Sequence, residues 1–364
     1  MINNKLFQPG IMNKIAVSNR LVVAPMTRIS ASEDGVPGVR MQQYYERFAR
    51  GQFGTIITEG IYIDDAWSQT YSYQSGLINH EQVSGWRTIN DSLHQFGSKV
   101  IAQIQHSGAL SQGNIYRKDT AGPSSVRPKG EQLKFYYGNG HYQVPHELTD
   151  DEIQNIIRSF AETAVRAVNQ AGFDGVEIHG ANGYLLDQFF TDYTNLRNDR
   201  WGGDIASRLS LTLEVIRAVR QAVGVDVVVG VRISQGKVND FLHKWKEGEQ
   251  GAESVFKLLN ESGVDYVHIT EYEAWQPAFA DSSSTLVELA RKFAPDLTLI
   301  ANGSVDTADK AHKVMNLGAD FIAIGKSALA NPDWPQRILN KQVLRAFDGS
   351  ILTPQADVKD SELV

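Results

Sequence analysis

The segment Asp174-Gly-Val-Glu-Ile-His-Gly-Ala-Asn-Gly-Tyr-Leu-Leu-Asp-Gln-Phe-Phe-Thr-Asp-Tyr193 carries the pattern on which the predicted fold and function depend. It opens with apolar residues between polar neighbours, as in a short buried strand, and continues into an apolar helix start. At the strand's end, His179, Asn182 and Tyr184 follow within six positions. Three hydrogen-bond donors at the end of a parallel strand suggest a site that holds and protonates a ligand. A strand end with a capped turn and a core tyrosine would give the same pattern, so this segment alone leaves both interpretations open.

The composition of the whole chain is that of an ordinary globular protein. Of its 364 residues, 42% are hydrophobic and 21% are charged. The formal net charge of -7 argues against a nucleic-acid-binding surface and against a patch for anionic membranes. The chain has no Cys, which excludes disulfides, cysteine nucleophiles, thiolate zinc sites and iron–sulfur clusters held by thiolates. We see neither a secretory signal nor an apolar run of about 18 residues, so we expect a cytoplasmic protein without a membrane span.

Short apolar runs alternate with amphipathic stretches along the chain. Candidate strands are Leu21–Pro25, Gly54–Glu59, Lys99–His106, Gly175–His179, Asp226–Ile233, Val264–Thr270, Leu297–Asn302 and Ala319–Gly325. Candidate helices cover residues 40–50, 80–96, 150–171, 206–223, 250–262, 284–294, 307–317 and 333–340. Near-continuous apolar runs are typical of parallel strands buried on both faces. Eight strands alternating with eight helices predict an α/β fold, a (β/α)8 TIM barrel, rather than an open doubly wound sheet.

Three segments lie outside this alternation, and we predict that all of residues 1–364 form one domain. Residues 3–19 read as a short hairpin that closes the barrel's N-terminal end. Residues 107–148 read as an enlarged loop between the third strand and the third helix, over the face where barrel active sites lie. The polar tail from about residue 348 is expected to pack loosely or against a partner subunit, and the sequence leaves a homo-oligomer open.

The last two predicted strands end in small residues that suit an anion. Gly303 and Ser304 follow the seventh strand, and Gly325 and Lys326 follow the eighth. The loops after strands 7 and 8 are the usual phosphate site of this barrel, because small residues free backbone N–H groups there. Tight turns alone would also explain the two glycines.

Two polar residues lie within apolar strands. Arg232 ends the run Val227-Val-Val-Gly-Val-Arg, and a buried arginine needs an anionic or strongly polar partner. An ion pair with a strand-end carboxylate is the structural alternative for Arg232. The amide of Gln103 must find hydrogen-bond partners or face the barrel centre, where a planar heterocycle would satisfy it.

The triplet of donors fits oxyanion stabilisation better than metal binding. His179 and Asn182 provide one good and one poor ligand, with no acidic or cysteine partner at ligand spacing, so we predict no metal. Both can instead donate to a developing oxyanion. Tyr184 can then act as a general acid.

The chain resembles the Old Yellow Enzyme family of flavin-dependent ene-reductases over nearly its whole length. The matching motifs are Leu6-Phe-Gln-Pro-Gly, Asn19-Arg-Leu-Val-Val-Ala-Pro-Met-Thr27, Gln103-Ile-Gln-His-Ser-Gly108, Asp174 to Phe189, Asn195 to Arg208, and Gly325-Lys326 with Ala330-Asn-Pro-Asp333. The resemblance implies an NAD(P)H-dependent flavin oxidoreductase with one FMN at the barrel mouth, NADH or NADPH as reductant, and a small-molecule substrate such as an α,β-unsaturated carbonyl compound.

The resemblance also implies a role for each candidate residue. The residues implied to bind the cofactor are Pro25, Met26, Thr27, Gly60, Gln103, Arg232, Gly303, Ser304, Gly325 and Lys326. The first five would line the isoalloxazine, Arg232 would neutralise charge that appears on reduction, and the last four would hold the phosphate. His179 and Asn182 would grip the substrate's carbonyl oxygen, and Tyr184 would donate the proton.

The chain departs from the family pattern at several positions. Lys326 stands where many relatives have Arg, and lysine lacks the bidentate fork. Thr27 stands where some bacterial relatives have Cys, and Asp204-Ile-Ala replaces a more usual Ser-Pro-Glu-like segment. The loops 107–148 and 271–284 fit no substrate pattern and are expected to set specificity. Without cysteines or a second nucleotide fold, the iron–sulfur dienoyl-CoA reductase type is disfavoured.

Two other functions stay open from the residues alone. A phosphate-binding aldolase or isomerase without flavin would need a Schiff-base lysine or a carboxylate at a strand end, for which Lys326 and Glu59 are the candidates. A barrel that only stores redox equivalents would bind flavin without turnover.

Overall fold

The computed structural model describes residues 4–363, and in it eight parallel strands close into a barrel. Around the ring the order is β4-β3-β13-β12-β11-β10-β9-β6, and pairing of β4 with β6 closes it. The strands are β3 (Leu21–Val23), β4 (Thr55–Ile57), β6 (Lys99–Gln105), β9 (Gly175–Asn182), β10 (Val228–Lys237), β11 (Tyr266–Thr270), β12 (Thr298–Asn302) and β13 (Phe321–Ile324). The predicted TIM barrel is therefore confirmed.

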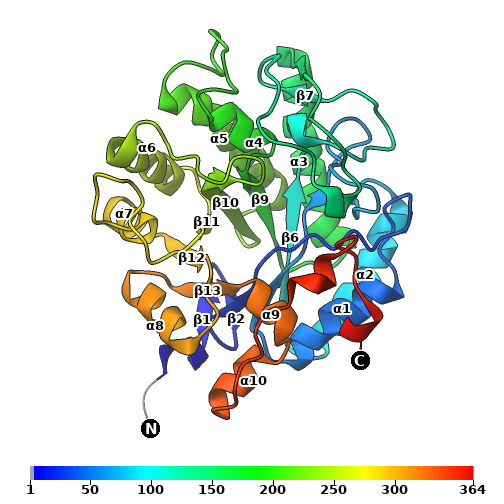
Figure 1. The fold of residues 1–364 in the computed structure, drawn as a ribbon, viewed down its shortest axis with the longest axis vertical. Coiled ribbons are helices and arrows are strands. Elements are labelled where there is room, and N and C mark those ends of the chain that lie inside the picture. Colours follow the sequence, from blue (N-terminus) through cyan, green and yellow to red (C-terminus); the bar gives the residue numbers. More distant parts are fainter. Residues whose placement is uncertain (1–3, 364) are drawn as a thin grey trace.

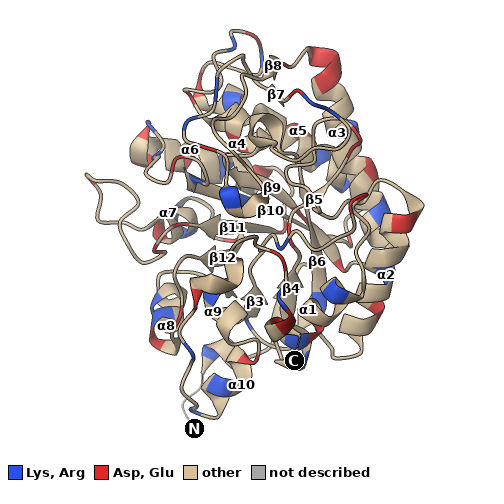
Figure 2. Cartoon of the chain, turned by 45° about the vertical axis from the view of Figure 1, so that its right-hand side comes forward, with Lys and Arg blue, Asp and Glu red and all other residues tan. Residues whose placement is uncertain are grey.

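Helices follow the strands and surround the ring (Figure 1). They are α1 (Val39–Arg50), α2 (His80–His94), α3 (Asp150–Val165), α4 (Leu185–Phe190), α5 (Ile205–Val223), α6 (Gly248–Glu261), α7 (Leu286–Phe293), α8 (Ala308–Asn316), α9 (Lys326–Ala330) and α10 (Trp334–Leu339). Each of the eight predicted helices corresponds to one of these, and α4 and α9 are short additions at the strand ends. The Lys, Arg, Asp and Glu residues lie mostly on the outer helices and loops (Figure 2).

The predicted N-terminal hairpin exists and closes the N-terminal end of the barrel. Strand β1 (Gly10–Met12) pairs antiparallel with β2 (Ile15–Val17). Met12 and Val17 belong to a buried cluster with side chains from the barrel strands, including Ile101 and Phe321. Asn3, where the expected hairpin begins, lies outside the described residues. The apolar hairpin thus keeps water out of the end opposite the predicted site.

The predicted long loop after the third barrel strand is also confirmed. Between β6 and α3 it holds only short elements, namely η2 (Gly108–Leu110), β7 (Ala121–Gly122), η3 (Lys134–Tyr136) and β8 (His146–Glu147). Buried residues along it, such as Leu110 and Tyr142, pack against Tyr184. The loop therefore forms a wall of the barrel mouth.

The expectation of a loosely packed tail is wrong for its second half, residues 356–363. Ala356 and Val358 are fully buried, and Glu362 is only 6% exposed. The tail lies across the chain's own α1 and the loop after β3, where Arg28, Arg40 and Arg47 bind it. Polar composition suggested exposure, but these polar groups find buried partners far away in the sequence.

Candidate active site

A polar layer crosses the barrel interior below the mouth. The parallel register aligns Gln103 of β6 with Glu177 of β9. The Glu177 carboxylate accepts hydrogen bonds from the Gln103 amide at 2.8 Å, the Tyr266 hydroxyl at 3.1 Å and His268 Nδ1 at 2.9 Å. Burial alone would raise the pKa of Glu177, but His268, Arg232 and Gln103 hold the pKa below its usual value. A carboxylate thus sits beneath the mouth and takes one of the two N–H groups of the Gln103 amide, the side chain for which a heterocycle is the expected partner.

Arg232 lies directly above this layer without a carboxylate contact. Its guanidinium is 6% exposed and donates only to neutral oxygens, those of Thr270 and Asn302, each at 3.3 Å. Its Nε is buried and has no hydrogen-bond partner within the described part of the chain. No ion pair within 4.0 Å involves Arg232 among residues 4–363, so the structural alternative of a strand-end ion pair is not supported. A buried donor without a partner is costly, which points to an acceptor supplied from outside the chain.

His179 is held as a neutral hydrogen-bond donor. It pairs in register with Arg232 on β10 and is 3% exposed. Burial, with the nearby Arg232 and His268, lowers the pKa of His179 well below its usual value. Its Nδ1 accepts the N–H of Ala181 at 3.4 Å, which leaves the proton on Nε2. The imidazole can therefore donate one hydrogen bond without carrying charge.

Tyr184 lies beside this imidazole and is paired with a second tyrosine. The rings of His179 and Tyr184 are 4.9 Å apart and meet edge to face. The Tyr184 hydroxyl lies 2.8 Å from the Tyr71 hydroxyl. Burial raises the pKa of Tyr184 to about 12, against the opposing effects of Tyr71 and Arg232. The phenol is therefore protonated at neutral pH and already aligned by a neighbour.

A buried ion pair fixes the turn that carries Asn182 and Tyr184. Asn182 ends β9 in the left-handed region, with a φ of 62°, and its N–H donates to Ser234 Oγ at 2.8 Å. The next N–H, of Gly183, donates to Asp187 at 2.6 Å. Lys237 contacts both oxygens of Asp187, at 2.8 and 2.9 Å, and the two side chains are 3% and 1% exposed. Asn182 itself is half-buried, so its side-chain amide lies at the edge of the interior.

The residues after β3 line the other side of the mouth. Pro25, Met26 and Thr27 are each partly exposed between buried neighbours. The Thr27 carbonyl accepts the Tyr136 hydroxyl at 3.0 Å, which ties this segment to the long loop. Gly60 is buried, and a Cβ there would overlap the Gln105 amide, so packing alone explains this glycine.

The four phosphate candidates meet at the ends of the neighbouring strands β12 and β13. Gly303 has a φ of 150°, and a Cβ there would lie 2.5 Å from the Glu271 carbonyl oxygen, so only glycine fits. Ser304 is exposed, and its hydroxyl donates to the Tyr272 carbonyl at 2.6 Å. Lys326 is exposed and forms no ion pair among the described residues. Backbone N–H groups and one free ammonium are thus available to an anion.

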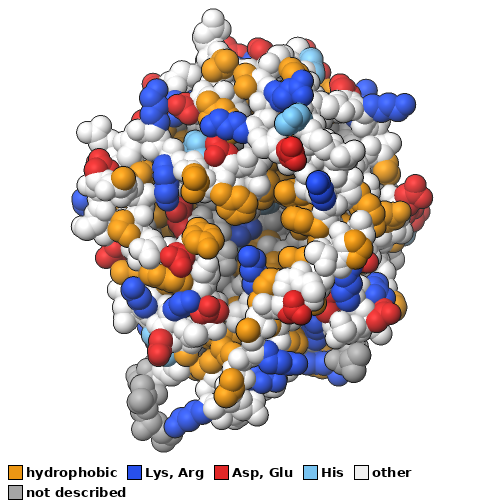
Figure 3. Space-filling view, viewed as in Figure 1, with side chains coloured by type: hydrophobic (Ala, Val, Ile, Leu, Met, Phe, Trp, Pro, Cys, Tyr) orange, Lys and Arg blue, Asp and Glu red, His pale blue; other side chains and the backbone are white. Residues whose placement is uncertain are grey.

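FMN fits this arrangement in three respects. The unpartnered Nε of Arg232 awaits an acceptor. A Cβ built on Gly325 would meet only Ala24 and the Met26 sulfur, each at 3.9 Å, so space is open beside Met26. Figure 3 shows a hollow at the centre of the strand ring, with Lys or Arg side chains inside it and hydrophobic side chains around its rim. A planar ring with a charged tail matches a cationic hollow that has an apolar rim.

The sequence did not single out several of these partners. Glu177 alternates with His179 on one strand, so the period of two could have placed both side chains inside the barrel. Tyr71 lies in an irregular segment 113 positions before Tyr184, and no local pattern links them. Lys237 and Asp187 are likewise 50 positions apart.

The sequence is similar to those of known proteins over most of its length. A model of the NADH:flavin oxidoreductase / NADH oxidase family matches residues 5–344. The chain is 32% identical over 346 residues to NADH oxidase of Thermoanaerobacter brockii. The matched region covers 91% of this chain but only 50% of that protein, so this chain spans about half of that relative's length. It is 32% identical over 335 residues to the probable flavin mononucleotide-dependent alkene reductase of Leishmania infantum, covering 90% of this chain and 88% of that one.

The structural similarity is equally broad. The old yellow enzyme homologue from Zymomonas mobilis superposes with a TM-score of 0.87 at 29% identity, covering 98% of both chains. Within the described residues, no helix combines the length and apolar character needed to cross a membrane.

Proposed function

Because the chain belongs to the NADH:flavin oxidoreductase / NADH oxidase family, we propose that this NAD(P)H-dependent flavin oxidoreductase reduces α,β-unsaturated carbonyl compounds, or nitro and quinone analogues. The observation that carries the proposal is the set of His179, Asn182 and Tyr184 beside a buried arginine that lacks an anionic partner. A relative's name, alkene reductase, supports this substrate class. The family assignment sets aside the aldolase or isomerase without flavin.

The groups without a partner at the mouth support the flavin-binding role proposed for the residues around them. Arg232 would face the flavin with its unpartnered Nε, and Pro25, Met26 and Thr27 would line the ring. Gly60 and Gln103 would lie along its edge. Gly303, Ser304, Gly325 and Lys326 would hold the phosphate through backbone N–H groups and one ammonium. When bound, FMN takes two electrons from NADH or NADPH and passes them to the acceptor.

The carbonyl oxygen of the acceptor would lie against His179 and Asn182. His179 Nε2–H is a neutral donor, so it can polarise the carbonyl without a fixed countercharge. Asn182 adds an amide donor from the same strand end. Both donors sit on β9, which pairs with β6 and β10 on its two sides, so the strand fixes their spacing and orientation contributes to the rate.

Tyr184 would then donate its proton to the α-carbon. Its pKa of about 12 keeps the phenol protonated at neutral pH, and the Tyr71 hydroxyl at 2.8 Å can stabilise negative charge left on the Tyr184 oxygen. The ion pair of Asp187 with Lys237 keeps the turn that carries this phenol in place.

Flavin content and turnover test the proposal together. We expect the purified protein to carry one FMN with a yellow absorption spectrum and to oxidise NADH or NADPH when cyclohexenone is added. A colourless protein that binds no FMN would contradict the proposal. A yellow protein that is reduced by nicotinamides but passes nothing to cyclohexenone, nitro compounds or quinones would instead support a store of redox equivalents.

A further inference from the structure

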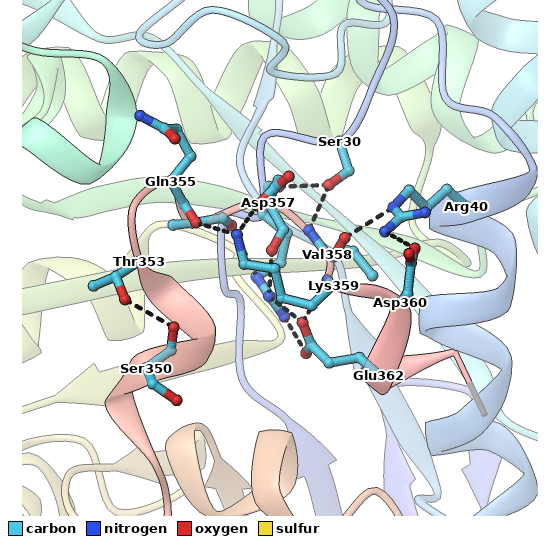
Figure 4. A network of polar contacts seen from close by, with 12 residues as sticks. Ser30, Arg40, Ser350, Thr353, Gln355, Asp357, Val358, Lys359, Asp360 and Glu362 are labelled. Atoms are coloured by element: carbon cyan, nitrogen blue, oxygen red, sulfur yellow. Dashed lines mark hydrogen bonds and ion pairs between the residues drawn. The ribbon is translucent and has the colours of Figure 1, made fainter.

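Arg28, the residue after Thr27, is bound by the C-terminal tail. Its side chain is 1% exposed, and its guanidinium makes a bidentate contact with Glu362, at 2.6 and 2.5 Å. It also donates to the carbonyls of Ala356 at 3.1 Å and Asp357 at 2.7 Å. Figure 4 shows the tail residues of this network gathered around the segment after β3. A buried arginine with this many donors engaged is fixed in one orientation.

Glu362 has a second arginine partner besides Arg28. Arg47 of α1 donates to its carboxylate at 2.9 Å and to its carbonyl at 2.9 Å. Burial alone would raise the pKa of Glu362, but Arg28 and Arg47 hold the pKa below its usual value. The carboxylate is thus charged, and it compensates the buried guanidinium of Arg28 and the partly buried one of Arg47. Its loss would leave these charges without a counterion.

The main chain of Arg28 is anchored as well. Its N–H donates to the Glu59 carboxyl at 3.2 Å, and its carbonyl accepts the Ser30 hydroxyl at 2.7 Å. The same hydroxyl accepts the N–H of Val358 at 2.8 Å. The segment that begins with Thr27 is therefore attached to the tail through both main chain and side chain.

A second connection runs from the tail to the proposed proton donor. The N–H of Ala356 donates to the Phe135 carbonyl at 2.8 Å. The next residue, Tyr136, donates to the Thr27 carbonyl, and its ring lies 4.2 Å from that of Tyr71. Tyr71 in turn contacts the Tyr184 hydroxyl. The tail thus joins the flavin side of the mouth to the substrate side.

We propose that Glu362 is a positioning residue of the active site, which acts through Arg28 to set Thr27 against the flavin and, through the bound tail, the long loop against Tyr184. This inference rests on the proposed placement of the flavin beside Thr27. Glu362 touches neither flavin nor substrate, so its effect is on geometry. Glu362 then supports the site from a distance, although it lies 334 positions from Arg28 in sequence.

The test compares Glu362→Gln with Asp360→Asn in the full-length enzyme. Both changes remove one carboxylate from the tail, but the Asp360 side chain is 93% exposed and pairs with Arg40 at the surface, where an ion pair contributes little. For Glu362→Gln we expect a changed flavin absorption spectrum, and a dissociation constant for FMN and a KM for cyclohexenone each raised on the order of tenfold, because small misplacements are costly in oriented sites. Asp360→Asn should match the wild type in all three.

The melting temperature of each variant separates positioning from stability. If Glu362→Gln melts earlier but keeps the wild-type spectrum, FMN affinity and KM, the pair is structural and the proposal is wrong. Equal changes in Asp360→Asn would also overturn it. Should Glu362→Gln fail to fold, Glu362→Asp keeps the charge and is expected to show intermediate values, whereas wild-type values would contradict the proposal.

Thr27→Ala distinguishes this inference from the proposed function. If Thr27→Ala changes the flavin spectrum and Glu362→Gln does not, only the role of Glu362 fails. If Thr27→Ala also leaves the spectrum unchanged, the placement of the flavin beside Thr27 fails, and the inference that rests on it falls too.

Discussion

Replacing Tyr184 with phenylalanine tests the proposed proton donor. The change removes one hydroxyl and keeps the ring that meets His179 at 4.9 Å. We expect reoxidation of the reduced flavin by cyclohexenone to slow by about 10²–10⁴-fold, the usual contribution of a general acid. Reduction of the flavin by NADH or NADPH needs no proton from Tyr184, so its rate should stay within about twofold of the wild type.

The structure also predicts the cost in stability. Tyr184→Phe leaves the buried Tyr71 hydroxyl without its partner at 2.8 Å, which costs about 1–3 kcal/mol in the free energy of unfolding. Tyr71→Phe is the matched control, because it breaks the same hydrogen bond but keeps the Tyr184 phenol. We expect this control to lose similar stability and to slow the cyclohexenone rate less than Tyr184→Phe does, because it removes the hydrogen bond to the Tyr184 oxygen but keeps the proton donor.

Anaerobic stopped-flow absorbance at the flavin band measures the two half-reactions separately. Equal slowing of both half-reactions in Tyr184→Phe would remove Tyr184 from the acid role. Equal loss of the cyclohexenone rate in both variants would assign the effect to the hydrogen bond, not to proton donation.

Three further predictions concern buried charges. Burial raises the pKa of Glu59 to about 7 from 4.5. The protonated carboxyl therefore contributes stability that is fully present below pH 4.5 and is lost as the pH rises through 7. Urea unfolding from pH 5 to 8 should show the wild type losing about 3 kcal/mol in the free energy of unfolding relative to Glu59→Gln. An equal pH dependence in both would contradict this. Lys237→Met leaves the 1%-exposed carboxylate of Asp187 unpaired, and should lower the free energy of unfolding by about 3–5 kcal/mol; a loss below about 1 kcal/mol would disprove this reading of the pair. Arg232→Gln removes the cation proposed to face the reduced flavin, so dye titration should give a more negative reduction potential, and an unchanged potential would place Arg232 away from the ring.

The barrel could be predicted because its elements are local patterns. All eight strands and eight helices appear as apolar periods, and their order favours one architecture. The predicted ends of the strands were less accurate than their order. Strand β9 extends to Asn182 and β10 to Lys237, beyond the apolar runs, because the backbones of these two residues pair with each other. When the main chains of polar residues pair, the sequence shows no hydrophobic pattern that would predict the strand.

The candidate site likewise has residues that the sequence could predict and partners that it could not. His179, Asn182, Tyr184 and Arg232 could be singled out because each is a polar residue at or just beyond the end of an apolar run. Their partners could not, since the contact of Tyr71 with Tyr184 spans 113 positions and that of Arg28 with Glu362 spans 334. The polar tail was misjudged for this reason. Its composition resembles a solvated segment, whereas its carboxylate compensates buried arginines that only the tertiary fold brings close.

A crystal structure of the enzyme with FMN tests the central claim most directly. We expect the isoalloxazine in the hollow of the strand ring, with Arg232 within hydrogen-bond distance of it and with His179, Asn182 and Tyr184 on its open side. FMN bound elsewhere, or these three side chains turned away from the ring, would contradict the account.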